Sequence, residues 1–332
     1  MESRIILADA SGKELGYVDK IEADFEVGEK NDFEIRISVE DWNPNITFGC
    51  LLYIQETEFG GFVEEIESGT RENAIYVRGL TWRGLLTKKI IEPPSDSDYR
   101  YESGYVEDIT RKLIKEFEID GFFKVKNNAG GKQVRFYAFN RYATLLDGLE
   151  RLLYSAGCKL VLKYTKPSPE QGYVELIIEK IKDYSSEMEL SQDCALDFTA
   201  NEKRNGVNHL ICLGKGELKD RIVKHLYIQQ DGSVGETKYY TGLEEIADIY
   251  DYSSATESEL IKEGKKRIRE LMNSKTFKPE IKEGIEQEFE IGDIIAGRDY
   301  ITGITVSKQV IGKIYTCKDG QEKIDYKIKG DD

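Results

Sequence analysis

A chain of 332 residues is long enough for two or three domains with a sizeable buried core. Hydrophobic residues make up 39% and aromatic residues 11%, including 20 tyrosines, which excludes a disordered protein and favours a β-rich fold. The net charge of −15 excludes electrostatic attraction to nucleic acid or to anionic membranes.

The five cysteines are widely spaced, and no pair has the Cys-x-x-Cys spacing of zinc or redox motifs. We therefore expect no metal site and synthesis in a reducing cytoplasm. The first residues lack the basic region and long apolar run of a signal peptide. No segment has about eighteen uninterrupted apolar residues, so the sequence predicts no membrane span. The cysteines are Cys50, Cys158, Cys194, Cys212 and Cys317.

Residues 1–94 predict a β domain. Apolar residues alternate over 21–27 and 33–39, and the turn residues of 28–31 suit a hairpin between them. Short strands at this spacing favour a barrel or a sandwich over a parallel sheet with crossover helices. Further strands are expected over 4–8, 50–56, 62–68 and 73–79.

The segment 75–94 changes from strand to helix spacing. We expect a strand that Gly79 interrupts, then a short apolar helix that Pro93 and Pro94 stop. We interpret the segment as a plug that closes the end of a barrel and leads into a second domain. An ordinary strand–helix corner is the alternative. The apolar positions of the expected helix are Leu80, Leu85, Leu86 and Ile90.

Residues 95–190 predict an α+β insert domain. The helical period over 106–117 gives one helix, and Thr144 and Gly157 have the residue types that begin and end a second. A strand over 134–139 precedes that second helix. Two further strands form a hairpin after it, over 159–164 and 173–180.

Residues 191–332 predict a second β domain with a helical insertion near 241–275. Thr256 and Glu259 form a capping box at the start of the inserted helix. The fold class we expect is therefore α+β and mainly β, with two β-barrel domains and α/β insertions. The expected domains are 1–94, 95–190 and 191–332.

No recognisable catalytic constellation is present. His209 and His225 lie in apolar strand patterns, where a histidine is more often a hydrogen-bonded strand residue than a catalyst. Adjacent carboxylates such as Glu64 and Glu65 arise by chance among 62 acidic residues. Asp293 follows a glycine before a strand, which favours turn chemistry over a site acid. We therefore expect no enzyme, no cofactor and no catalytic residue.

Four stretches in order carry a resemblance to a known family. They are 77–94, 143–157, 206–221 and 290–330, and they resemble the tail hub proteins of long-tailed siphophages, which are related to the central baseplate hub of contractile tails and phage-tail-like particles. One departure is Lys88-Lys89, where the family pattern has an arginine. The positions that match family structural motifs are Gly79, Trp82, Leu85, Leu86, Asn208, Gly214, Gly216, Glu217, Arg221, Gly292 and Asp293.

The resemblance implies a non-enzymatic structural role in the virion, at the tail tip of a phage or prophage particle made in the host bacterial cytoplasm. It implies a homotrimer whose two tail-tube-like barrels per subunit adapt a sixfold tail tube to threefold tip machinery. DNA and the tape-measure protein would pass through the ring, and the acidic charge suits a channel that does not grip DNA.

The resemblance also implies partners. These are the tail tube, the distal tail protein and the tape-measure protein, with a tip fibre or hydrolase on a separate chain. No specific binding of nucleic acid is expected. Two other functions stay open at this stage: a cell-wall hydrolase that uses carboxylates, and a host-receptor or carbohydrate-binding β module supported by the many tyrosines.

Overall fold

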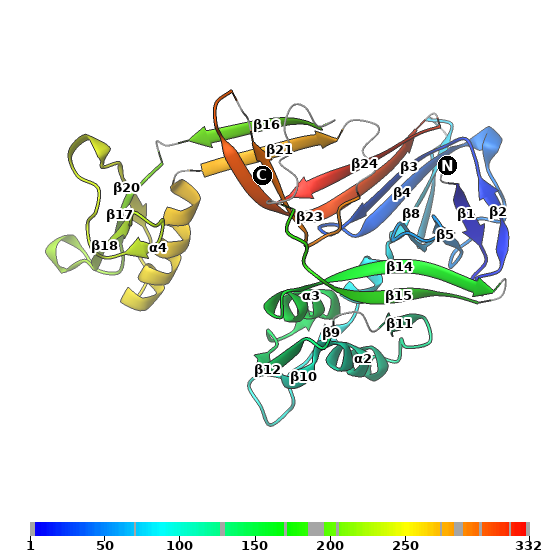
Figure 1. Cartoon of the computed structure of the whole chain (residues 1–332), viewed down its shortest axis with the longest axis horizontal. Helices are drawn as coiled ribbons and strands as arrows, with labels where there is room; N and C mark the ends of the chain where they lie inside the picture. The colour runs from blue at the N-terminus through cyan, green and yellow to red at the C-terminus, as the bar shows by residue number, and fades with distance from the viewer. Residues whose placement is uncertain are drawn as a thin grey trace. The chain divides into compact units, whose positions relative to one another are not determined.

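The computed structural model divides into two compact units (Figure 1). Unit 1 comprises Met1–Phe198, Pro279–Gly297 and Ser307–Asp332, and unit 2 comprises Thr199–Lys278 and Arg298–Val306. The structure describes residues 4–69, 71–126, 130–168, 171–184, 196–203, 206–272, 274–281, 288–298, 301–318 and 320–329.

The N-terminal part of unit 1 consists of short strands, as the alternating pattern predicts. In β4, for example, Phe33, Ile35 and Ile37 are buried and alternate with polar residues on the other face. The strands are β1 (Ile5–Ala8), β2 (Glu14–Val18), β3 (Ile21–Val27), β4 (Asp32–Ser38), β5 (Leu51–Tyr53), β6 (Gly60–Phe62), β7 (Glu65–Gly69) and β8 (Ala74–Leu80).

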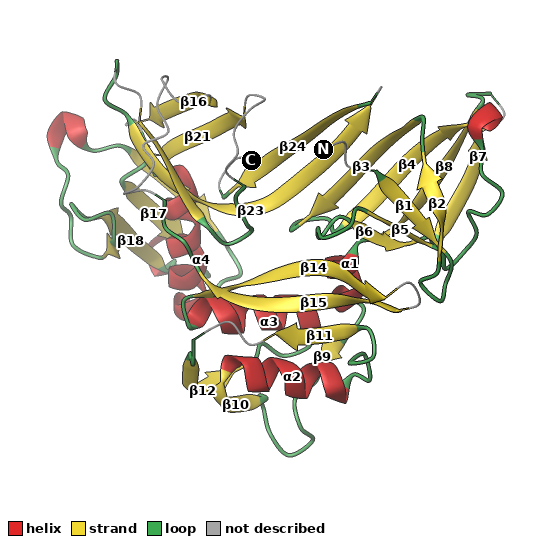
Figure 2. Ribbon diagram, turned by 45° about the vertical axis from the view of Figure 1, so that its right-hand side comes forward, coloured by secondary structure: helices red, strands yellow, loops and turns green. Residues whose placement is uncertain are grey.

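The largest sheet of unit 1 joins both ends of the chain. Its order is β22-β23-β3-β4-β8-β7, with β24 also paired to β23. Strand β23 runs antiparallel to β3, and Tyr315 lies opposite Phe25. The C-terminal strands therefore complete the N-terminal sheet, as Figure 2 shows. They are β22 (Ile294–Arg298), β23 (Thr305–Lys318) and β24 (Gln321–Ile328).

In a second sheet, β2-β1-β5-β6, the strands β1 and β5 are buried on both faces, whereas most of β2 is exposed. In β1, Ile5 and Leu7 pack against the large sheet, whereas Ile6 and Ala8 point into a separate core. Neighbouring strand residues face opposite ways, so four consecutive apolar residues serve two cores. The second core is shared with the α+β segment that follows, which is why residues 95–184 belong to the same compact unit as residues 4–94.

The α+β segment of unit 1 places three helices in that shared core. Leu113 of α2 and Leu149 of α3 are fully buried there, together with Leu86 of α1. Figure 2 shows the long β14–β15 hairpin beside α3. The elements are α1 (Trp82–Thr87), β9 (Ile90–Ile91), β10 (Tyr101–Tyr105), α2 (Val106–Glu116), β11 (Phe123–Lys126), β12 (Gln133–Ala138), β13 (Ala143–Thr144), α3 (Leu145–Ser155), β14 (Cys158–Ser168) and β15 (Gln171–Lys180).

Unit 2 is a four-stranded sheet, β19-β18-β17-β20, packed against α4. The predicted capping box of α4 forms between Thr256 and Glu259, and Leu260 and Ile268 bury one side of the helix. Strands β16 and β21 pair with each other. The elements of unit 2 are β17 (His209–Leu213), β18 (Val223–Ile228), β19 (Val234–Gly235), β20 (Ala247–Asp251) and α4 (Glu257–Leu271), whereas β16 (Leu196–Lys203) and β21 (Ser274–Ile281) each belong partly to unit 1.

The expected fold class is confirmed, because strands account for 45% and helices for 19%. The described strands form open sheets, and no closed barrel is detected among them, so the two expected barrels stay a prediction. The expected division into the domains 1–94, 95–190 and 191–332 stays a prediction beside these two compact units. Alternation along one strand identifies the strand but not its partner, so the pairing of β23 with β3 lies outside what local pattern predicts.

Two local predictions in the segment 75–94 are corrected. Gly79 lies inside β8 and does not end it, and Ile90 belongs to β9 because α1 stops at Thr87. The plug interpretation placed α1 at the end of a barrel. Helix α1 instead lies in the core that the sheet β2-β1-β5-β6 shares with α2 and α3.

Candidate functional site

The segment from Gly79 to Leu86 is a buried packing centre. Trp82 is fully buried, stacks on Tyr164 with ring centroids 5.1 Å apart, and meets Phe62 edge-on at 5.8 Å. A Cβ atom at Gly79 would lie 1.9 Å from the carbonyl oxygen of Phe62, so only glycine allows these strands to approach. Leu86 is fully buried, and Leu85 packs against the same core while half-buried.

Arg83, within this segment, is a functional candidate that sequence reasoning missed. Its side chain is 1% exposed, and all three of its nitrogens donate. Nε donates to Glu58 Oε2 at 2.7 Å, Nη1 to Glu150 Oε1 at 2.9 Å, and Nη2 to the carbonyl of Leu160 at 2.7 Å. The sequence signal that could have indicated this buried cation is an arginine between a tryptophan and a glycine in an apolar helix.

The ion pairs continue from Glu58 to a second buried cation. Lys313 Nζ lies 2.5 Å from Glu58 Oε1 and 2.7 Å from Glu290 Oε2. Burial opposes ionisation of Glu58, but Lys313 and Arg83 outweigh burial and lower the pKa of Glu58 well below its usual value. Glu58 is therefore ionised in the fold, and its ion pairs with Arg83 and Lys313 link α1 to β23.

The Gly292–Asp293 motif is a second buried anchor, which agrees with turn chemistry. Asp293 is 1% exposed, and Lys159 Nζ donates to both of its carboxylate oxygens at 2.7 Å. The backbone N–H groups of Lys182 and Glu290 also donate to this carboxylate, each at 3.0 Å. With four hydrogen bonds accepted, Asp293 fixes the entry to β22 and is not free to act as a catalytic acid.

The motif from Asn208 to Arg221 lies in unit 2 and holds loops. Asn208 Nδ2 donates to the carbonyl of Glu244 at 2.7 Å, and Asn208 Oδ1 accepts from the N–H of Ile246 at 2.9 Å. Arg221 Nε donates to the carbonyl of Gly214 at 3.0 Å, and Nη2 donates to Asp251 Oδ1 at 2.5 Å. These contacts fix the loop before β20 and the turn after β17.

Gly216 and Glu217 form that turn. Gly216 has a φ of +110°, and a Cβ there would lie 2.5 Å from the carbonyl oxygen of Asp220. The exposed Glu217 contributes its carbonyl, which accepts from the N–H of Asp220 at 3.0 Å. The motif therefore encodes a tight turn, and it leads into a three-residue 3-10 helix and not into the α-helix that follows a phosphate-binding loop.

The two histidines are hydrogen-bonded strand residues, as the sequence predicts. Nδ1 of His209 lies 2.6 Å from Glu245 Oε1, and its Nε2 lies 2.8 Å from Nδ1 of His225. The His209 ring stacks on Tyr227 with centroids 4.4 Å apart. Hydrogen bonds from Lys238 and His209 lower the pKa of Glu245, so the carboxylate stays charged beside the pair.

One pocket of about 690 Å³ brings two of the predicted motifs together. Arg83 and Gly292 both line it, along with Lys159 and Glu150. Burial raises the pKa of Glu150, and the charge of Arg83 opposes that rise. The lining is mostly apolar, and Arg83, Glu150 and Lys159 are held in ion pairs. The residues that line this pocket belong to unit 1, whereas the motif of Asn208 lies in unit 2.

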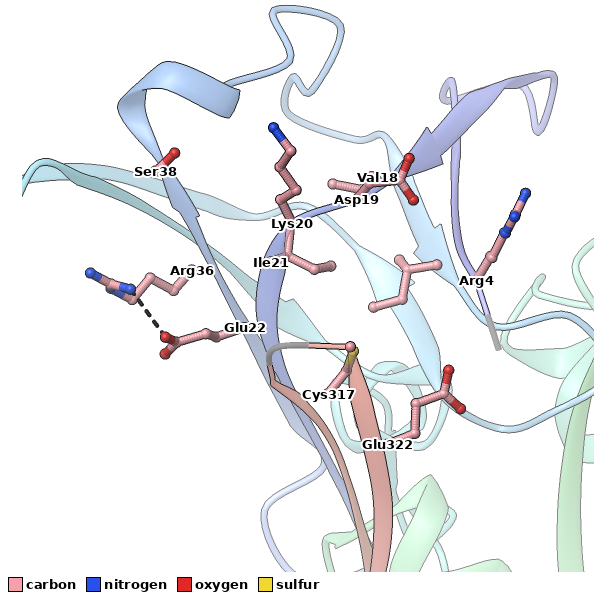
Figure 3. Close-up of a pocket in the computed structure, with 12 residues that line it drawn as sticks. Arg4, Val18, Asp19, Lys20, Ile21, Glu22, Arg36, Ser38, Cys317 and Glu322 are labelled. Carbon is pink, nitrogen blue, oxygen red and sulfur yellow. Dashed lines mark hydrogen bonds and ion pairs between the residues drawn. The ribbon is translucent and has the colours of Figure 1, made fainter. Parts of the chain in front are cut away.

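A second pocket, of about 520 Å³, opens beside β3 and β23 (Figure 3). Figure 3 shows Arg36 directed at Glu22, and their charged atoms lie 3.3 Å apart. Three cations and three carboxylates line the pocket, so it favours neither an anionic nor a cationic ligand. They are Arg4, Lys20, Arg36, Asp19, Glu22 and Glu322.

Two further searches cover the described part of the chain. It contains no group of three or more histidine, cysteine or carboxylate side chains arranged to hold a metal ion. None of its helices combines the length and apolar character that a membrane crossing needs. Cys194, one of the five cysteines, lies outside the described residues.

Comparison with known proteins rests on structure alone. No protein-family model matches the chain, and no curated protein matches it. A tail protein from Neisseria meningitidis MC58 has a TM-score of 0.53 at 13% identity, over 100% of this chain and 97% of that one. The 43 kDa tail protein of prophage MuSo2 from Shewanella oneidensis has a TM-score of 0.52 at 14% identity, over 98% of both chains.

A third solved structure points the same way. Prophage tail protein gp18 from Listeria monocytogenes EGD-e has a TM-score of 0.52 at 12% identity, over 99% of this chain and 95% of that chain. The resemblance drawn from four sequence stretches and the likeness of the whole fold agree. This chain has the fold of phage and prophage tail proteins.

Proposed function

We propose that the chain is a structural hub subunit at the tip of a phage or prophage tail. The observation that carries the proposal is the likeness to tail proteins along the whole length of the chain. A likeness confined to one sheet would support only a shared building block. One that takes in both units and all four sequence motifs supports a shared architecture.

The roles of the motif residues support a structural part. Trp82, Arg83 and Asp293 hold the core, and Asn208 and Arg221 hold loops through backbone carbonyls and amides. The polar side chains of Arg83, Asp293, Asn208 and Arg221 form hydrogen bonds within the chain, whereas a catalytic group needs a free position facing substrate. Residues that hold the fold in this way are consistent with a structural subunit.

The oligomer in this proposal is a homotrimer. A ring of three subunits would adapt a sixfold tail tube to threefold tip machinery and let DNA and the tape-measure protein pass. The tail tube, the distal tail protein and a separate fibre or hydrolase chain would be its neighbours. The net charge of −15 suits a channel that repels DNA, because phosphates and carboxylates carry the same sign.

Labelling of intact particles tests the place of the chain. Tails released from a producing host would be treated with an antibody against the chain and imaged with gold-conjugated secondary antibody. The proposal predicts gold at one end of the tail, distal to the head. Gold along the whole tail, or none on particles that carry labelled tube protein, would contradict a tip hub.

A cell-wall hydrolase is the second candidate, and Glu150 is the observation that favours it. A carboxyl with a raised pKa that borders a pocket is the form a general acid takes in glycoside hydrolysis. The test is clearing of a peptidoglycan suspension by the purified chain and by Glu150→Gln. The hub proposal predicts no clearing by either protein. Clearing that Glu150→Gln abolishes would establish the hydrolase.

A further inference from the structure

The two-stranded ribbon of β10 and β12 has one face in the core and one in solvent. On the inner face, Val134 and Tyr137 pack against the shared core of unit 1. On the outer face the exposed residues of β10 alternate with less exposed ones, and Tyr101 is 43% exposed. We call the side chains of Tyr99, Tyr101, Arg135 and Phe136 the outer ribbon face.

A β-bulge turns two adjacent residues of β12 outward. The register pairs Glu102 with Tyr137 and Gly104 with Val134, which leaves Arg135 and Phe136 opposite Ser103 alone. The Ser103 hydroxyl donates to the carbonyl of Arg135 at 2.5 Å and holds the irregular geometry. Bulges serve to re-aim side chains, and strict alternation counted from the inward-facing Val134 would turn Phe136 toward the core.

The outward side chains form an aromatic surface. Phe136 is 72% exposed and stacks on Tyr101 with ring centroids 4.5 Å apart, while Tyr99 lies 6.3 Å from Tyr101. Together these three rings present about 300 Å² if a fully exposed ring presents about 200 Å². The largest apolar patch of a folded protein is commonly of this size and is often functional, and aromatic and arginine side chains are enriched where interfaces are buried.

The charge of the outer ribbon face is opposite to that of the chain. The two strands contain two charged residues, Glu102 and Arg135. Glu102 is directed inward, where Arg100 and Lys112 neutralise it. Arg135 points outward and forms no ion pair with another residue that the structure describes. An exposed cation beside aromatic rings attracts an acidic surface, and this chain has a net charge of −15.

We propose that the outer ribbon face binds a second copy of this chain in the assembled ring. The inference rests on the proposed hub function, which supplies several copies in one particle, and it identifies one side of their contact. A basic aromatic face and the acidic surface of the next copy make a head-to-tail contact, and such contacts close into rings when the rotation between copies allows it.

Sedimentation of the full chain and two matched variants tests the proposal. Phe136→Glu replaces the most exposed aromatic ring of the outer ribbon face with a negatively charged carboxylate. Phe48→Glu is the control, because Phe48 is 68% exposed in unit 1 and lies outside the ribbon. Neither position contributes to a core, so both variants should fold, which thermal melting would check. We expect Phe136→Glu to weaken self-association by at least about 30-fold and Phe48→Glu to leave it unchanged.

The possible outcomes separate this inference from the hub proposal. Loss of association in Phe136→Glu alone supports the outer ribbon face as the contact. Equal association of Phe136→Glu and wild type overturns it and leaves the hub proposal standing. Equal loss of association in both variants also overturns it, because the loss is then not specific to the outer ribbon face. A wild-type chain that stays monomeric at every concentration, both alone and mixed with the tail-tube and distal-tail proteins, overturns the contact between copies, while the place of the chain in the tail is decided separately by gold labelling.

Discussion

Arg83 in unit 1 and Arg221 in unit 2 make similar hydrogen bonds in different surroundings. Each donates to one backbone carbonyl and to carboxylate oxygen. The Arg83 side chain is 1% exposed and its partner Glu58 is 2% exposed, whereas Arg221 is 22% exposed and its partner Asp251 is 56% exposed. Burial therefore decides how much each ion pair contributes to stability, because water screens the exposed pair of Arg221 and Asp251 but not the buried pair of Arg83 and Glu58.

Both arginines lie in sequence stretches that resemble the tail hub family, but Arg83 joins distant elements of a core and Arg221 joins one turn to a neighbouring strand. Arg83 ties the helix α1 to the hairpin strand β14 through Leu160 and to β23 through Glu58 and Lys313. Arg221 ties one turn to one neighbouring strand. We infer that the motif of unit 1 determines whether the core forms and that the motif of unit 2 determines how a loop is held.

The largest effect is expected from Leu86→Asp. Leu86 is fully buried among α1, α2 and α3, so an aspartate there would be an unpaired charge in the core. The cost is several kcal/mol, on the order of the whole stability. The chain should be insoluble, whereas Leu85→Asp at the half-buried neighbour should yield more folded protein. A Leu86→Asp variant that melts like wild type would show that the burial of α1 is wrongly assigned.

Arg83→Ala should follow in size. Removing the guanidinium takes away the hydrogen bonds that Glu58 and Glu150 accept from it, and this should lower the free energy of unfolding by about 3–5 kcal/mol. The matched variant is Arg221→Ala, which should cost about 1 kcal/mol because its ion pair is exposed. Urea unfolding of each unit, followed by hydrogen exchange, measures both. Equal costs for the two variants would remove the distinction between a core anchor and a loop clamp.

The ion cluster around Glu58 predicts acid sensitivity of unit 1. The pKa of Glu58 is lowered below its ordinary value of 4.5 by Lys313 and Arg83, which outweigh burial. Its contribution is therefore present above that ordinary value and is lost as the pH falls through the folded-state pKa. Stability measured from neutral pH downward should fall less steeply in Glu58→Gln than in wild type. Parallel curves below about pH 4.5 would contradict an ionised Glu58 in the fold.

A smaller effect is expected from Gly216→Ala in unit 2. Its φ of +110° and the 2.5 Å approach to the Asp220 carbonyl should together cost about 1–3 kcal/mol. Gly232→Ala is the control, since Gly232 has a φ of +79° but its nearest contact is 4.0 Å away. Hydrogen exchange in unit 2 should increase more in Gly216→Ala. If the two variants behave alike, backbone strain and not the tight turn explains the requirement for glycine.

The sequence pattern predicts helices and strands well where they depend on interactions between residues close together in the chain. The alternation of β3 and β4 and the capping box of α4 depend on neighbours within a few residues, and both are found as predicted. The pairing of β23 with β3 joins residues about three hundred positions apart. Nothing in the alternation of either strand specifies its partner, so the sheet order and the compact units are not predictable from it.

The candidate site divides in the same way. Gly216 and Asp293 occur in turn motifs whose chemistry is visible in sequence, and the structure gives both a structural role. The partners of Asp293 and Arg83 are not visible, because Lys159 and Glu58 come from distant elements. The bulge that exposes Phe136 is equally hidden, since it exists only in the pairing with β10. Long-range pairing, and not residue type, limits prediction here.

The native mass of the purified chain tests the central claim most directly. Sedimentation equilibrium over a range of concentrations, alone and mixed with the tail-tube and distal-tail proteins, would be combined with negative-stain images. A hub subunit of 38.0 kDa should sediment as a trimer and give ring-shaped particles, at the latest in the presence of those partners. A monomer under every one of these conditions would contradict the account of the chain as a tail hub.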